Sequence, residues 1–169
     1  MGHLTLVLGG ARSGKSAHAL ALAAASPGAR LFVATGEAFD DEMAERIARH
    51  KAERGPEWAL AEAPLDPAVA IAPLAATDVA VIDCLTLWLS NLMHHKRDCD
   101  DATDVLLGAA ASGSGRIIMV SNEIGMGLAP MNALGRAFRD AQGRLNQRVA
   151  AAADRVEFVA AGLPLVLKG

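Results

Sequence analysis

Short apolar runs recur along the chain, and the stretches between them carry apolar residues at helical spacing. The runs are nearly continuous rather than alternating, which is typical of strands in a sheet covered by helices on both faces. We therefore predict strands over residues 4–8, 31–34, 79–83, 117–121 and 156–160. A last run at 164–167 predicts a further strand at the edge of the sheet, where its proline is tolerated.

Helical patterns fall between these strands, at about 15–25, 40–54, 84–94, 101–111 and 132–153. Asp40 and Asp41 place negative charge at the start of the second helix, and Gly55-Pro56 ends it. Residues 96–104 and 112–115 predict loops. Because strands and helices alternate without a repeat or a long linker, we predict one α/β domain over residues 1–169, with a mostly parallel sheet flanked by helices. Ligands of such sheets bind at the carboxyl ends of the strands.

Composition narrows the class of protein. The 169 residues are 52% hydrophobic with a net charge of −3, which excludes a disordered chain and argues against a protein that coats nucleic acid. The N-terminus lacks a signal-peptide pattern, and no apolar stretch approaches the roughly 20 residues that cross a bilayer. Cys84 and Cys99 are too few for a disulfide framework, so we expect free thiols in a reducing compartment. These features predict a cytoplasmic protein with no membrane span and no nucleic-acid partner.

The segment GGARSGKS at residues 9–16 matches the phosphate-binding pattern G-x-x-x-x-G-K-[ST], between a predicted strand and a predicted helix. Glycines allow backbone N–H groups to surround phosphate oxygens, and the helix N-terminus adds its positive end. We expect Lys15 at the β- and γ-phosphates and the Ser16 hydroxyl at Mg²⁺. The predicted nucleotide contacts in this loop are Gly9, Gly10, Ala11, Arg12, Ser13, Gly14, Lys15 and Ser16. The pattern indicates a nucleoside triphosphate without identifying its base.

A carboxylate partner for Mg²⁺ is expected at the end of another buried strand. Asp83 follows the apolar run VAVI and fits this position. The alternative is that Asp83 caps the helix that begins at Cys84, and the two roles are compatible. The guanine-reading pattern N-K-x-D is absent from the sequence, which disfavours a regulatory GTPase.

Three residues share one stripe of the predicted helix at 40–54. Arg46, His50 and Arg54 are spaced i, i+4 and i+8. Guanidinium groups neutralise phosphoryl oxygens and keep a neighbouring imidazole unprotonated, so His50 is a candidate nucleophile toward phosphorus. On spacing alone, a surface histidine is the more frequent interpretation.

Other conspicuous residues favour structural roles. His94 and His95 lie near a helix end, and together with Cys99 they match no familiar zinc pattern. Trp58 and Trp88 are predicted packing anchors. The last predicted helix has a basic face that suits either ligand phosphates or a solvated or subunit-facing surface. Its residues are Arg136, Arg139, Arg144 and Arg148.

Motifs along nearly the whole chain together resemble one enzyme family. After the phosphate loop come VAT at 33–35, DEM at 41–43, RI at 46–47, HK at 50–51, WALAEAP at 58–64, DCLTLWL at 83–89, NEIGMGLAP at 122–130, and FRD and NQ within 136–147. Each later motif is modest alone, but their order and spacing make the joint match specific. The chain resembles the bifunctional adenosylcobinamide kinase / adenosylcobinamide-phosphate guanylyltransferases of cobalamin biosynthesis.

This resemblance implies a RecA-like P-loop NTPase fold, a homotrimer and two reactions. In the first, ATP or GTP phosphorylates the aminopropanol hydroxyl of adenosylcobinamide. In the second, GTP guanylylates a histidine, and the GMP passes to adenosylcobinamide phosphate to give adenosyl-GDP-cobinamide. The alternative is a monofunctional P-loop kinase that lacks guanylyl transfer, and a non-catalytic nucleotide-binding regulator is a third class.

By motif position, the resemblance implies that His50 carries the GMP and that Lys15 is the second catalytic residue. It implies further nucleotide contacts at Thr35, Gly36, Glu37, Lys51, Ala52, Glu53, Arg54, Glu62 and Asp83. The stretch 91–117 is short for the family. Aromatic residues make up only 4% of the chain, so we expect aliphatic surface and shared subunit walls to hold the corrinoid.

Overall fold

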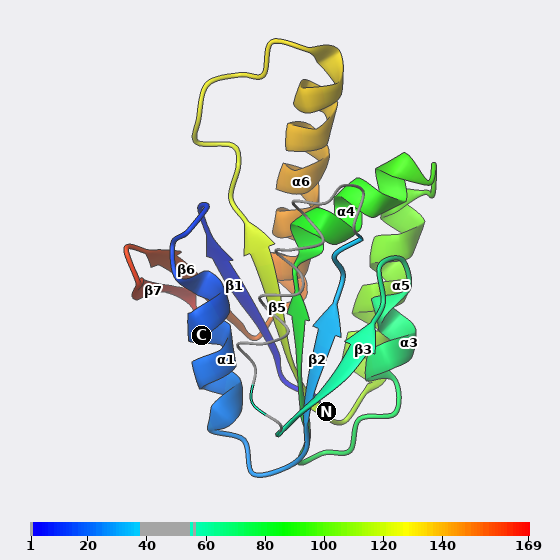
Figure 1. Ribbon diagram of the computed structural model, residues 1–169, viewed down its shortest axis with the longest axis vertical. Coiled ribbons are helices and arrows are strands. Elements are labelled where there is room, and N and C mark those ends of the chain that lie inside the picture. The colour runs from blue at the N-terminus through cyan, green and yellow to red at the C-terminus, as the bar shows by residue number, and fades with distance from the viewer. Residues whose placement is uncertain (1, 38–54, 56) are drawn as a thin grey trace.

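A seven-stranded sheet forms the centre of the molecule, with strand order β3-β2-β4-β5-β1-β6-β7 (Figure 1). This computed structural model describes residues 2–37, 55 and 57–169. Neighbouring strands are parallel except for the antiparallel pair of β6 and β7. The strands are β1 (Leu4–Gly9), β2 (Arg30–Ala34), β3 (Trp58–Glu62), β4 (Val79–Asp83), β5 (Arg116–Asn122), β6 (Arg155–Ala160) and β7 (Leu163–Lys168).

Helices cover both faces of the sheet. The described helices are α1 (Lys15–Ala24), α3 (Pro67–Ile71), α4 (Leu85–His94), α5 (Cys99–Ser112) and α6 (Ala133–Ala152). On one face, Ala19 and Ala23 of α1 join an apolar core with side chains of the central strands. On the other face, the remaining described helices share a second core, in which Trp88 is 1% exposed.

Side chains of the central strands alternate between these two cores. In β5, Ile117 and Met119 belong to the core under α3–α6, whereas Ile118 and Val120 belong to the core under α1. Because both faces are covered, every position along such a strand is apolar, which is why the sequence shows continuous runs. The predicted α/β class is confirmed, and so are the six predicted strands.

Two predictions of local structure were incomplete or wrong. The edge strand β3 and the short helix α3 were not predicted, because β3 has only half-buried or exposed positions and α3 has five residues. The predicted loop at 96–104 is wrong, since α5 begins at Cys99. The Asp98 carboxylate accepts hydrogen bonds from the backbone N–H groups of Asp100 and Asp101 at 2.9 and 3.0 Å, so this acidic run is a helix N-terminus. The predicted helix at 40–54 lies outside the described residues.

The predicted packing roles of the two tryptophans and the predicted free state of the two cysteines are confirmed. Trp88 donates its indole N–H to the carbonyl of Leu65 at 2.9 Å within the core, and Trp58 meets Phe32 edge-to-face. Cys84 and Cys99 are both free thiols. In the described part of the chain, no helix is both long enough and apolar enough to cross a bilayer.

Candidate active site

The glycine-rich loop joins β1 to α1 at the carboxyl edge of the sheet, where sequence analysis predicted it (Figure 1). Arg12 and Gly14 have positive φ angles of 55° and 92°, and these turns fold the loop back over the helix end. The N-cap residue of α1 is Gly14, which makes no side-chain cap hydrogen bond to the first turn of the helix. An uncapped helix N-terminus inside a glycine-rich turn suits a phosphate group.

Two glycines of the loop are required by its packing. A Cβ atom at Gly9 would lie 2.6 Å from the carbonyl oxygen of Val159 in β6. A Cβ atom at Gly14 would lie 3.2 Å from the Cα of Gly162, on a backbone with positive φ. The loop is also tied to the turn between β6 and β7, because the N–H of Gly162 donates to the carbonyl of Ser13 at 2.8 Å.

Lys15 lies folded against the loop rather than extended into solvent. Its side chain is 9% exposed, and Nζ donates to the carbonyl of Gly10 at 3.0 Å. Ser16 follows it in the first turn of α1 and is half-buried. The ammonium is therefore held over the loop, within reach of any phosphate that the loop binds.

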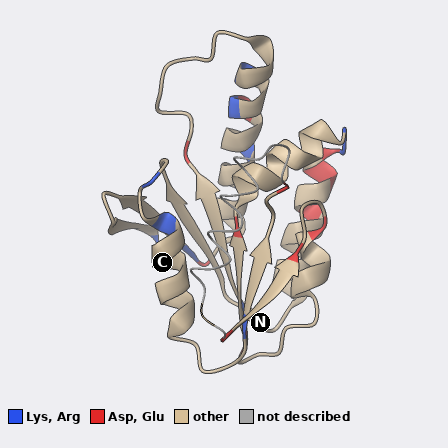
Figure 2. Ribbon diagram, in the orientation of Figure 1, with Lys and Arg blue, Asp and Glu red and all other residues tan. Residues whose placement is uncertain are grey.

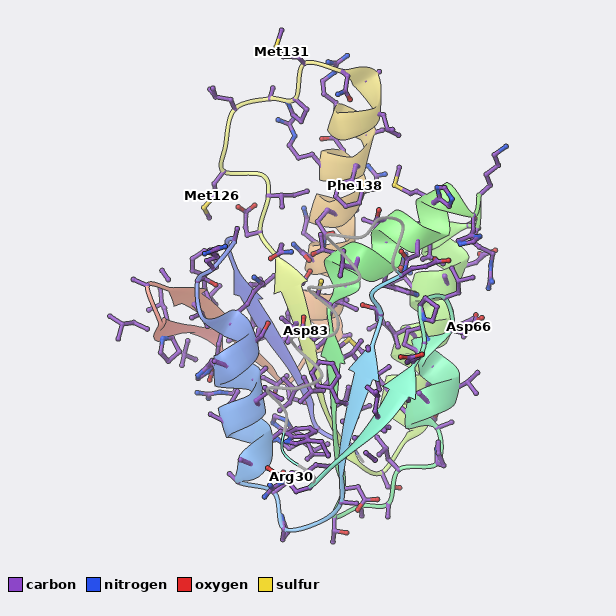
Figure 3. The ribbon with its side chains drawn as sticks, in the orientation of Figure 1. Arg30, Asp66, Asp83, Met126, Met131 and Phe138 are labelled. Atoms are coloured by element: carbon purple, nitrogen blue, oxygen red, sulfur yellow. The ribbon has the colours of Figure 1, made fainter. Side chains whose placement is uncertain are left out.

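Asp83 ends β4 on the same face of the sheet as α1. Val79 and Val81 belong to the core under α1, and alternation along the strand places Asp83 on that face (Figure 3). The alternative role as helix cap is wrong, because Cys84 is the N-cap of α4 and its sulfur accepts from the N–H of Leu87 at 3.5 Å.

Asp83 and Lys15 both affect the pKa of the Cys84 thiol. Burial is the largest cause that raises the pKa of the Cys84 thiol to about 11; the Asp83 carboxylate acts in the same direction, and Lys15 acts in the opposite one. The thiol is therefore protonated and unreactive at neutral pH.

Thr35 connects the carboxyl ends of β2 and β4. Its hydroxyl donates to the carbonyl of Cys84 at 2.7 Å and accepts from the N–H of the same residue at 2.8 Å. Asn91 of α4 donates to the carbonyl of Thr35 at 2.7 Å and to that of Pro64 at 2.9 Å. Sequence reasoning missed Asn91, although a buried amide in an apolar helix was the available signal.

The remaining implied contacts divide into two groups. Glu62 ends β3 and is paired in register with Ala34, which is paired in turn with Asp83, so these carboxylates line one edge. Oε2 of Glu37 lies 3.1 Å from Nε2 of His95, at hydrogen-bonding distance. Gly36 precedes Glu37 in the same segment. The second group, His50, Lys51, Ala52, Glu53 and Arg54, lies outside the described residues.

Most of the predicted basic face on α6 is paired within the molecule. Arg136 donates to the carbonyls of Pro130 and Met131 at 3.0 and 2.9 Å. The other pairs are Arg148 with Asp100 and Asp104 of α5, and Arg139 with Asp140. Figure 2 shows these charges spread along α6 rather than gathered in a patch. The prediction of a phosphate-binding face therefore gains no support from these residues.

A cluster of charged side chains around the buried Glu157 lies between α1 and β6. Glu157 is 2% exposed and accepts hydrogen bonds from His18 and from Nε of Arg155. Burial alone raises the pKa of Glu157, but these hydrogen bonds outweigh burial and hold the pKa below its usual range. Sequence reasoning assigned no role to His18, which ties the helix of the phosphate loop to the sheet.

A polar network lies where β5 meets α6. Ser121 donates its hydroxyl proton to Oδ1 of Asn146 at 2.7 Å, and Gln142 donates to both side chains at 2.9 and 3.0 Å. Oδ1 of Asn146 thus accepts two hydrogen bonds, while its Nδ2 donates to the carbonyl of Asn122 at 3.1 Å. Asn122 and Asn146 stand in motifs that carry the family resemblance, whereas sequence reasoning did not single out Ser121 and Gln142.

The chain has close relatives of known description. It matches the family described as "Cobinamide kinase / cobinamide phosphate guanyltransferase" over residues 5–167. It is 45% identical to the bifunctional adenosylcobalamin biosynthesis protein CobP of Pseudomonas aeruginosa, over 97% of this chain and 96% of that protein. It is 40% identical to the bifunctional adenosylcobalamin biosynthesis protein CobU of Salmonella typhimurium, over 98% of this chain and 99% of that protein. The corresponding CobU of Escherichia coli is 36% identical, over 98% of this chain and 99% of that protein.

Proposed function

Because the chain belongs to the cobinamide kinase / cobinamide phosphate guanyltransferase family, we propose that a single nucleotide site at the carboxyl edge of its sheet serves both reactions. The protein is a bifunctional kinase and guanylyltransferase of adenosylcobalamin biosynthesis. The observation that carries the proposal is the uncapped N-terminus of α1 beneath a glycine-rich turn, with Lys15 folded over it.

In the kinase reaction the loop binds the phosphates of ATP or GTP. The aminopropanol hydroxyl of adenosylcobinamide attacks the γ-phosphorus, an O–P bond forms, and the bond from phosphorus to the β,γ-bridging oxygen breaks. The nucleoside diphosphate leaves with the bonding electrons, and the hydroxyl proton passes to water. Lys15 and the backbone N–H groups of α1 stabilise the negative charge on the phosphoryl oxygens.

The site also offers oxygen ligands that suit Mg²⁺. Mg²⁺ binds through one or two protein oxygens and completes its shell with phosphates and water. Ser16 in the first turn of α1 and Asp83 at the end of β4 provide such a donor pair. When bound, the ion neutralises phosphate charge. Glu62 and Glu37 add carboxylates along the same edge, and the Thr35 hydroxyl holds the strand ends in place.

The guanylyl transfer proceeds through His50, on the strength of the family resemblance. Its imidazole nitrogen attacks the α-phosphorus of GTP, a P–N bond forms, and pyrophosphate leaves. A phosphate oxygen of adenosylcobinamide phosphate then attacks the same phosphorus, the P–N bond breaks, and adenosyl-GDP-cobinamide forms. Arg54 and the neighbouring residues 51–53 are proposed to contact the nucleotide during this step.

Labelling with GTP separates this mechanism from the alternative, a monofunctional kinase. The protein is incubated with Mg²⁺ and GTP labelled in its α-phosphate. We expect acid-labile, alkali-stable label on the wild-type protein and on His3→Ala, which removes an exposed histidine, but not on His50→Ala. Protein that phosphorylates cobinamide yet takes up no label would support the monofunctional kinase.

We also propose a homotrimer in the cytoplasm. Exposed apolar side chains support self-association, because single chains rarely leave such residues grouped in contact with water. Two free thiols support a reducing compartment.

A further inference from the structure

The carboxyl end of β5 lies directly beside the phosphate loop. Asn122, the last residue of β5, is paired in parallel register with Gly9, the first residue of the loop. The N–H of Glu123 donates to the carbonyl of Gly9 at 3.0 Å, so the contact continues beyond the strand. Any phosphate that the loop binds therefore lies next to Asn122.

The side chain of Asn122 is on the face of the sheet that carries the nucleotide site. Ser121 points toward α6, where its hydroxyl binds Asn146, and successive side chains of a strand point to opposite faces. Asn122 thus shares the α1 face with Val120, which belongs to the α1-side core. Val120 is paired with Asp83, so Asn122 extends two residues beyond Asp83 on that face.

The backbone of Asn122 is fixed from two helices. Its N–H donates to the Thr86 hydroxyl of α4 at 2.9 Å, and its carbonyl accepts from Asn146 of α6 at 3.1 Å. Asn146 is itself held by Ser121 and by Gln142, which is fully buried. None of these bonds uses the side-chain amide of Asn122, and no hydrogen bond between described residues engages it. The structure therefore presents a rigidly mounted, half-buried amide at the phosphate loop.

We propose that the side-chain amide of Asn122 donates a hydrogen bond to the γ-phosphoryl group during its transfer to the acceptor hydroxyl. This inference rests on the proposed kinase reaction at the same site. A donor that is fixed before the reaction stabilises charge on the phosphoryl oxygens at no cost of reorganisation. An amide also adds no negative charge beside Asp83, whereas a carboxylate would repel the phosphates.

The test compares Asn122→Ala and Asn122→Asp with the wild-type protein. Kinase kcat and KM are measured with ATP and cobinamide, and nucleotide affinity is measured with a fluorescent ATP analogue. Loss of one fixed donor to a transferring group is expected to lower kcat by about 10²-fold, with nucleotide affinity changed by less than about threefold. Asn122→Asp is expected to fall below Asn122→Ala, because it keeps the shape of the side chain but adds a repelling charge. Gln147→Glu is the matched control, since it makes the same chemical change at an exposed position of α6.

The outcomes separate this inference from the proposed function. If wild-type protein does not phosphorylate cobinamide, the proposed function fails and the inference fails with it. If the wild type is active and kcat of Asn122→Ala stays within about threefold, the inference alone is overturned. It is also overturned if Asn122→Asp retains full activity. Parallel loss of kcat, nucleotide affinity and thermal stability in both variants would assign Asn122 to the scaffold instead.

Discussion

Lys15 is a buried cation whose hydrogen bond to Gly10 holds it over the phosphate loop. Replacing it with alanine is expected to abolish cobinamide phosphorylation, since several kcal/mol of transition-state stabilisation are lost, on the order of 10³-fold or more in rate. Phosphate transfer from labelled ATP measures the effect. Lys168→Gln, which changes a lysine on β7, should keep nearly wild-type activity. A Lys15→Ala protein that still phosphorylates cobinamide at a normal rate would contradict the assignment of the loop.

A single residue, Glu157, makes the stability of the fold depend on pH. Its pKa is lowered in the folded protein, so its contribution to stability is complete above its unfolded pKa of about 4.3 and is lost as pH falls through the folded pKa. We expect the urea concentration at the midpoint of unfolding of the wild type to decrease as the pH is lowered from 6 into the acidic range. For Glu157→Gln we expect a smaller decrease. An equal decline in both proteins would show that His18 and Arg155 do not stabilise the carboxylate. Glu123→Gln serves as a control, because this half-buried loop carboxylate accepts hydrogen bonds only from the nearby N–H groups of Gly125 and Met126.

At the scale of elements, the ends of β2 and β4 depend on one hydroxyl. Thr35→Val keeps the shape of the side chain but leaves the N–H and carbonyl of Cys84 without their hydroxyl partner. Unsatisfied buried groups cost roughly 1–3 kcal/mol each, so the loss of both partners should lower the free energy of unfolding by about 2–6 kcal/mol. Chemical denaturation measures the change. Thr77→Val, at an exposed threonine, should change stability by less than about 0.5 kcal/mol. A neutral Thr35→Val substitution would mean that Cys84 finds other partners.

The elements also explain why the site lies at one edge. Six parallel strands bring their carboxyl ends to the same side of the sheet, where the phosphate loop, Asp83 and Asn122 meet. Behind them, α4 and α6 each donate or accept a single hydrogen bond at the backbone of Asn122. The helices therefore position the ends of the strands as well as covering the core.

At the scale of the whole molecule, apolar side chains gather on the outer loop (residues 123–132) and the start of α6. Figure 3 shows Met126 and Met131 on this loop, beyond the body of the sheet. The exposed fractions are 80% for Met126, 98% for Leu128, 99% for Met131 and 72% for Leu134. Burying such residues in a homotrimer would remove apolar area from water, at about 25 cal/mol per Å².

This surface predicts the outcome of a sedimentation experiment. Leu128→Ser combined with Met131→Ser is expected to shift the protein toward monomer at micromolar concentration. The double variant removes two apolar side chains that are exposed in the single chain and that we expect to be buried between subunits. Val69→Ser, which changes a 75% exposed side chain on α3, should leave the oligomer unchanged. A double variant that sediments like the wild type would place the subunit contacts elsewhere, with the exposed strand β7 as the next surface to test.

Features that depend on neighbouring positions in the sequence were predictable from the sequence by itself. The glycine-rich loop is contiguous, and its pattern predicted roles for Lys15 and Ser16 as well as the strand and helix that the structure shows on either side. The continuous apolar runs predicted the buried strands and with them the α/β class. The position of Asp83 at the end of such a run placed it at the carboxyl edge.

Only the tertiary structure decided which distant residues meet. Asn91 reaches Thr35 across 56 positions and His18 reaches Glu157 across 139, and no local pattern encodes either pair. Strand order β3-β2-β4-β5-β1-β6-β7 places Asn122 beside Gly9, although 113 positions separate them (122 − 9). The physical reason is that local periodicity decides which face of an element is buried, whereas the order of strands depends on how all the elements pack at once.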